Sequence, residues 1–237
     1  MQFRTRRKAQ IWHTLTFVVA AFAVILQLVL EIEAARRLDL STQIIRFCSY
    51  LTIWFNALIA GTCVVLAVNP LHDGRAWRAL RLDAVVIGVG AGIVHWFLLR
   101  PLVDLHGAYY LADKLMHIAV PLLTLVGWLI FGPRNRVDRA DVCAFFVVPG
   151  VWLAYTLIRG PIVGWYPYPF IDVGLHGYAV VGAISVAIGA LLSALAAGAL
   201  WLDRRLDVGN LFEPDSCASG DGANPPRAER GAHTRPF

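Results

Sequence analysis

Long apolar runs, separated by short polar segments, make up most of this chain. An α-helix rises about 1.5 Å per residue, so about 20 apolar residues cross the roughly 30 Å hydrocarbon core of a bilayer. Six runs are long enough by this measure: residues 11–31, 45–68, 83–100, 111–131, 141–159 and 178–202. The pattern predicts an all-α fold, a polytopic integral membrane protein whose six transmembrane helices form one domain over residues 1–206.

The composition agrees with this interpretation. Hydrophobic residues make up 58% of the chain and charged residues 16%, with a mean hydropathy of +0.61, which is too apolar for an ordinary soluble domain. A basic segment precedes the first run, as in a signal peptide. However, residues 11–30 are longer than a signal core and end in Glu31 and Glu33 instead of a small-residue cleavage site. We therefore expect an uncleaved first span.

The distribution of basic residues predicts the orientation. With both termini in the cytoplasm, twice as many Lys and Arg residues fall in cytoplasmic loops as on the outer side. Cytoplasmic loops are usually the richer in these residues. We therefore expect cytoplasmic termini and a multi-pass protein of the cell (plasma) membrane.

From residue 207 the chain is rich in Gly, Pro, Ser, Asp and Arg. Such a composition cannot bury enough apolar surface to offset the entropy of ordering the chain. Residues 207–237 are therefore predicted to form a disordered cytoplasmic tail. The lipid bilayer is the expected partner, no nucleic acid partner is expected, and the sequence leaves the oligomeric state open.

The fourth run, residues 111–131, carries a histidine near its outer end. Pro121 has no N–H to give to the carbonyl of His117, so we expect a kink and a free backbone acceptor beside the imidazole. Asp113 lies one turn earlier on the same face. Ionisable side chains inside a span are costly and are usually functional, which makes His117 the leading candidate for a site.

Polar residues of other spans fall at a similar depth. On the predicted topology Thr52 lies about 9 Å and His95 about 8 Å below the outer surface, close to the level of His117. Thr52 and Asn56 lie four residues apart and so share one face of the second helix. The polar residues therefore gather in the outer half, and the supporting candidates are Asn56, His95, Asp113, Arg159 and Tyr166.

These residue types suit ester hydrolysis. A threonine hydroxyl is a weak nucleophile that needs a base within hydrogen-bond reach, and a neutral His117 can supply one for Thr52. Asp113 can orient that histidine, and Asn56 or His95 can donate to an oxyanion. The chains of a long-chain lipid ester partition into the bilayer, so such an ester is the natural substrate class. Neither a cofactor nor a metal is expected, and the four cysteines show no ligand spacing.

Three stretches resemble bacterial six-span proteins related to the androgen-induced protein family, whose animal members hydrolyse fatty acid esters of hydroxy fatty acids. The stretches are Phe47–Asn56, Asp113–Pro121 and Tyr155–Asp172. The resemblance implies that Thr52, in Leu51-Thr52-Ile53, is the catalytic threonine. It also implies that His117, which follows Met116 and precedes Pro121, is the catalytic histidine. Tyr168-Pro169-Phe170 matches a motif after the fifth span.

Other functions use the same residues. In a transporter, Asp113, His117, His95 and Arg159 would line an ion or proton path, although the cytoplasmic half offers few matching polar residues. In a metal hydrolase, His95, Asp113 and His117 would be the ligands. In a non-enzymatic membrane protein, each residue would be structural. Thr52 would then bond the carbonyl four residues before it, Asn56 would join helices, and Arg159 would be an interfacial anchor.

Overall fold

The computed structural model describes residues 2–34, 39–132 and 144–205. In these ranges the regular elements are helical and there is no β-strand, which confirms the predicted class. Five helical segments there are long and apolar enough to cross a membrane: residues 5–34, 51–68, 75–102, 107–131 and 173–205. They correspond to five of the six predicted spans.

The remaining predicted span, residues 141–159, corresponds to α8 (Val147–Val163), an apolar helix of 17 residues. This is shorter than the run of about 20 residues that a crossing usually needs. Residues 141–143 and the predicted tail, residues 207–237, lie outside the described ranges. The count of six spans and the cytoplasmic termini stay predictions.

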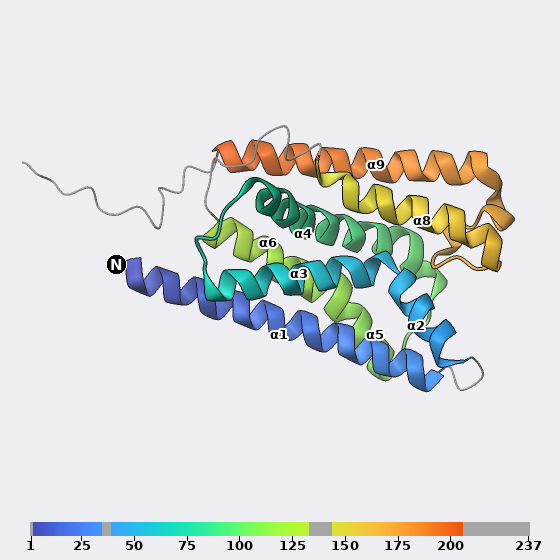
Figure 1. The fold of residues 1–237 in the computed structure, drawn as a ribbon, viewed down its shortest axis with the longest axis horizontal. Helices are drawn as coiled ribbons and strands as arrows, with labels where there is room; N and C mark the ends of the chain where they lie inside the picture. Colours follow the sequence, from blue (N-terminus) through green and yellow to red (C-terminus); the bar gives the residue numbers. More distant parts are fainter. Residues whose placement is uncertain (1, 35–38, 133–143, 206–237) are drawn as a thin grey trace, which may run out of the picture.

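The long helices lie side by side in a bundle (Figure 1). α1 (Gln2–Ala34) packs along α3 (Leu51–Val68), and α3 packs against α4 (Arg75–Val94). α4 also contacts α6 (Val120–Phe131) and α9 (Val173–Arg205). α8 and α9 lie together on the side of the bundle away from α1 (Figure 1).

The centre of the bundle is apolar. Side chains at most 1% exposed fill the space between α3, α4 and α6, among them Phe55, Ile59, Ile87 and Val120. By contrast, Ile25 of α1 is 59% exposed, as expected of a helix face that meets lipid.

Short elements gather at the end of the bundle where α2 and α5 lie (Figure 1). They are α2 (Leu40–Ser49), the π-helical turns η1 (His95–Leu99) and η3 (Leu115–Ala119), the 3₁₀ turns η2 (Arg100–Leu102) and η4 (Pro169–Ile171), and α5 (Gly107–Lys114). We call this the α2/α5 end. Its irregular backbone contrasts with the regular helices elsewhere.

The second predicted span is not one helix, and the continuous helix expected over residues 45–68 is wrong. The chain leaves helical geometry at Tyr50 (φ −75°, ψ 126°), which separates α2 from α3. The Tyr50 ring packs edge-on against Trp165 and Tyr168, at centroid distances of 5.9 and 5.6 Å. The break therefore accompanies a long-range aromatic contact, and it starts α3 at Leu51, one residue before Thr52.

The kink expected near Pro121 takes the form of a π-helical turn. The N–H of Val120 donates to the carbonyl of Leu115, five residues back. The carbonyl oxygen of His117 faces α4, where an added Cβ at Gly92 would lie only 2.7 Å from it. Glycine at position 92 thus allows α4 to approach η3 closely, and the second π-helical turn begins at His95, three residues further on.

Ionisable side chains are also buried at the opposite end of the bundle. They are His13 of α1, Arg81 and Asp83 of α4, and Asp203 of α9, all at most 9% exposed. The expectation that this half holds few polar residues is therefore wrong. Between the two polar regions, α3 and α4 bury apolar side chains, among them Ile59 of α3 and Val85, Val86 and Ile87 of α4. We call these the apolar centre.

Candidate active site

Thr52, His117 and Asp113 form a connected chain of polar groups at the α2/α5 end. Thr52 Oγ1 lies 3.4 Å from His117 Nε2. His117 Nδ1 lies 3.1 Å from both Oδ1 and the backbone oxygen of Asp113. A ring nitrogen that faces two acceptors keeps its proton, so Nε2 is left to accept a proton from Thr52. The order is that of a nucleophile, a base and a group that orients the base.

The hydroxyl of Thr52 is directed differently from most other hydroxyls of the helices. Because the helix breaks at Tyr50, Thr52 lies in the first turn of α3, and the carbonyl four residues back, that of Cys48, belongs to α2 and not to the helix of Thr52. Its hydroxyl instead meets His117 and Tyr168. Hydroxyls that do bond the carbonyl four residues before them are those of Thr14, Thr16, Ser49, Thr124, Thr156 and Ser193. The structural interpretation of Thr52 as a residue that bonds its own helix therefore does not hold.

His95 stacks on His117. The ring centroids are 3.8 Å apart and the planes differ by 11°. His95 Nε2 lies 2.8 Å from the same Asp113 Oδ1 that faces His117, and Asp113 Oδ2 accepts a hydrogen bond from Lys114 Nζ at 3.0 Å. The stack and the shared carboxylate limit rotation of the His117 ring.

The same three residues are close enough to ligate a metal, with ligand atoms within 4.8 Å of one another. Zinc in proteins is held by nitrogen and oxygen donors whose lone pairs converge tetrahedrally. Here the two imidazole planes are nearly parallel, and both facing nitrogens point at one carboxylate oxygen. This arrangement fits a hydrogen-bonded base better than a ligand set.

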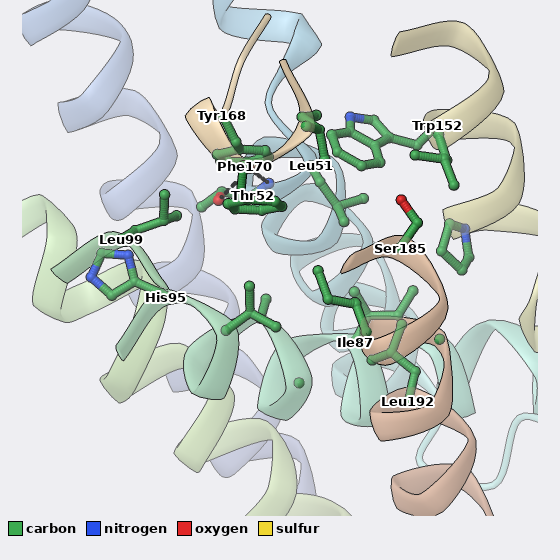
Figure 2. Close-up of a pocket in the computed structure, with 18 of the residues that line it drawn as sticks. Leu51, Thr52, Ile87, His95, Leu99, Trp152, Tyr168, Phe170, Ser185 and Leu192 are labelled. Atoms are coloured by element: carbon green, nitrogen blue, oxygen red, sulfur yellow. Dashed lines mark hydrogen bonds between the residues drawn. The ribbon is translucent and has the colours of Figure 1, made fainter. Parts of the chain in front are cut away.

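Tyr168 is a site residue that the sequence analysis did not select. Its hydroxyl lies 3.0 Å from Thr52 Oγ1 and accepts a hydrogen bond from the Thr52 N–H at 3.1 Å (Figure 2). Burial raises the pKa of Tyr168, so the hydroxyl keeps its proton. The Tyr168-Pro169-Phe170 motif is the one sequence signal that points to this residue, and Tyr166 was selected instead.

Three of the predicted supporting residues do not have the roles expected of them. The ring of Tyr166 packs against Gly160, and the guanidinium of Arg159 lies 5.6 Å from the Trp165 ring centroid. Asn56 is fully buried, and its Nδ2 donates to the backbone oxygen of Thr52 at 2.9 Å. Asn56 therefore holds the start of α3, and this geometry does not provide the oxyanion donor that was expected of it.

Two cavities meet at Thr52. The first has a volume of about 290 Å³ and lies between α3, α4, α8 and α9. Figure 2 shows it with His95 and Leu99 on one side, Thr52 and Tyr168 on another, and mostly apolar side chains around the rest. The second, of about 270 Å³, lies between α1, α2 and α5. Five residues line both cavities: Thr52, His95, Leu99, His117 and Tyr168.

Comparisons with protein families, with curated proteins and with solved structures find no match to this chain. The geometry of the site is therefore the basis for its function.

Proposed function

We propose that this protein is an intramembrane threonine-type hydrolase of lipid (fatty acyl) esters, with Thr52 as nucleophile and His117 as base. One observation carries the proposal: Thr52 Oγ1 lies 3.4 Å from His117 Nε2 while His117 Nδ1 faces Asp113, at the wall of an apolar cavity. Catalytic hydrogen bonds are often long in the absence of substrate, so this distance suits a nucleophile and its base.

The reaction has two steps. In the first, Thr52 Oγ attacks the ester carbonyl carbon while His117 Nε2 takes its proton. The bond to the alcohol oxygen then breaks, and His117 returns the proton to that oxygen, which leaves an acyl-threonine and a free alcohol. In the second, a water attacks the acyl carbon, His117 takes and returns one proton, and the fatty acid leaves with Thr52 restored.

Tyr168 supplies the stabilising donor in this scheme. Its hydroxyl is within 3.0 Å of Thr52 Oγ1, where negative charge develops as the threonine loses its proton. The N–H of Thr52 donates to the Tyr168 oxygen, so the tyrosine's own proton is available for the threonine oxygen or the oxyanion. Tyr168 thus takes the role of oxyanion donor that was expected of Asn56 or His95.

The first cavity supports a lipid substrate. Ile87, Val94 and Leu192 are among its walls, and burying an acyl chain against such side chains is favourable by about 0.8 kcal/mol for each CH₂ group. We also propose that the protein lies in the cell membrane with cytoplasmic termini and that it is a member of the androgen-induced protein family. These two proposals rest on the charge distribution and on the resemblance of the motifs around Thr52 and His117.

A transporter is the alternative. It would need polar groups to continue from the site to the opposite end of the bundle. Along α3 and α4 the side chains between the two polar regions include Ile59, Val86 and Ile87, all at most 2% exposed. This apolar centre supports the enzyme over a conducting path, and measurement of ion flux in proteoliposomes tests the alternative directly.

Covalent labelling tests the proposed nucleophile. A fluorophosphonate probe should label the wild-type protein, and Thr52→Ala should abolish labelling and lower kcat/KM for a p-nitrophenyl palmitate substrate by about 10³-fold or more. Thr62→Ala is the matched control, since Thr62 is also buried in α3 and its hydroxyl donates to the Ile59 carbonyl of the same helix. It should retain both labelling and activity. A folded Thr52→Ala protein with wild-type activity would refute the mechanism.

A further inference from the structure

The second cavity differs from the first in the groups that line it. Polar and ionisable side chains enter it from three helices, namely Gln27 and Glu31 of α1, Tyr109 and Asp113 of α5, and His117 of η3. Of the described residues that line it, none is a lysine or an arginine. The described part of its wall therefore carries two carboxylates, Glu31 and Asp113, and no lysine or arginine.

Glu31 is held in place and acts on its neighbours. Its Oε1 accepts a hydrogen bond from Gln27 Nε2 at 2.8 Å. Tyr50, which also lines the cavity, has its pKa raised to about 12, first by burial and then by the Glu31 carboxylate, whose effect outweighs the opposing one of Arg46. Asp113 is neutralised by the adjacent Lys114 at 3.0 Å, so Glu31 is the carboxylate that a ligand would face.

His95 adds an acceptor at the junction of the two cavities. Its side chain is 8% exposed, Nε2 faces Asp113, and Nδ1 has no hydrogen-bond partner among the described residues. With the proton on the nitrogen that faces the carboxylate, Nδ1 offers a lone pair. A buried acceptor without a partner is unfavourable until a donor reaches it. A hydroxyl group of the substrate would be such a donor.

We propose that the second cavity binds the alcohol part of the ester, and that this part is small, uncharged and hydroxyl-bearing, as in a monoacylglycerol. The proposal rests on the proposed hydrolase function. The apolar first cavity takes the acyl chain, and the acceptors Glu31 and His95 Nδ1 take hydroxyl donors of the alcohol. A carboxylate in the same place would be repelled by Glu31, so the inferred alcohol differs from the hydroxy fatty acids that are the alcohol parts of the esters hydrolysed by the animal members of the androgen-induced protein family.

This placement agrees with the proton transfer of the first step. His117 lines both cavities, so the leaving alcohol oxygen on the second side lies within its reach for protonation. After the alcohol leaves, the polar second cavity gives the attacking water a route to the acyl-threonine. The first cavity thus holds the acyl chain, and the second holds the alcohol part and then admits the water.

Matched substrates test the proposal. The two esters 1-palmitoylglycerol and 3-palmitoylglycerate have the same acyl chain and alcohol parts of nearly equal size, but the second has a carboxylate in place of a hydroxymethyl group. The wild-type protein should show a kcat/KM about tenfold or more higher for the glycerol ester, mainly through KM. Glu31→Gln keeps the shape and the contact with Gln27, and it should raise kcat/KM for the glycerate ester severalfold. Glu33→Gln, an exposed neighbour outside the cavity, should change neither value.

The outcomes separate this inference from the proposed function. Fluorophosphonate labelling at Thr52 together with equal or reversed preference for the glycerate ester would overturn the inference and leave the hydrolase standing. The same holds if Glu31→Gln and Glu33→Gln behave alike. Absence of labelling and of hydrolysis of either ester by folded wild-type protein would refute both.

Discussion

Both ends of the bundle bury ionisable side chains, but they bury them in different ways. At the α2/α5 end, Thr52, His117 and Asp113 make direct contacts and line cavities. At the opposite end, His13 and Asp83 project from regular stretches of α1 and α4, and neither lines the two cavities that meet at Thr52. Burial of an ionisable group therefore does not by itself mark the proposed catalytic region of this protein.

The backbone explains the contrast. A regular helix satisfies its own carbonyls, and the hydroxyl of Thr16, near His13, bonds the carbonyl of Trp12 in this way. At the α2/α5 end, the break at Tyr50 and the two π-helical turns interrupt that pattern. Side chains there turn toward neighbouring helices instead. Single-turn π-helical distortions are often found at functional sites.

The two buried histidines give the strongest test of this comparison. His117→Gln should lower kcat/KM by about 10³-fold, because the base is lost. His13→Gln, an equal change at the opposite end, should leave the activity of the folded protein unchanged. Residues that act as one unit are not additive, so Thr52→Ala combined with His117→Gln should be little worse than either change alone. Steady-state assays in detergent would compare the three single variants and the double variant with the wild-type protein. A large loss of activity in His13→Gln would mean that the opposite end of the bundle also contributes to activity.

Two tyrosines of one loop give a second test. Tyr168→Phe should lower kcat by about 10²-fold, because a donor at Thr52 Oγ1 is removed while the ring packing on Phe170 remains. Tyr166→Phe removes a hydroxyl that is also shielded from solvent, but the Tyr166 ring packs on Gly160 and not on Thr52, so this variant should keep its activity. Equal kinetics for the two variants would mean that Tyr168 has only a packing role.

The smallest expected effect concerns the helix contact behind the histidine stack. Gly92→Ala would place a Cβ 2.7 Å from the His117 carbonyl oxygen, so α4 and η3 must separate, with a loss of roughly 1–3 kcal/mol of stability and a severalfold loss of activity. Gly61→Ala, in α3, meets nothing within 4 Å and should be neutral or stabilising by about 0.5–1 kcal/mol. Thermal unfolding in detergent compares them, and an unchanged melting temperature for Gly92→Ala would contradict the close approach.

Much of the region around His117 could be predicted from the sequence. Helical spacing places Asp113 and His117 on one face, and Pro121 predicts a distorted turn beside them. The equal depth of Thr52 and His117 follows from the helix rise and the lengths of the apolar runs. These predictions rest on distances along a single helix or across a bilayer of fixed thickness, which the order of residues sets directly.

The tertiary structure decided what the chain pattern could not. Hydropathy over residues 45–68 is continuous, and nothing local marks the break at Tyr50, because the break accompanies packing of its ring on Trp165 and Tyr168, more than a hundred residues away in the chain. The same contact brings Tyr168, and not Tyr166, to Thr52. Asn56 likewise shares a helix face with Thr52, yet its amide bonds the carbonyl of its own helix. Apolar patterning determines which segments enter the membrane, whereas contacts between distant segments determine which polar atoms meet there.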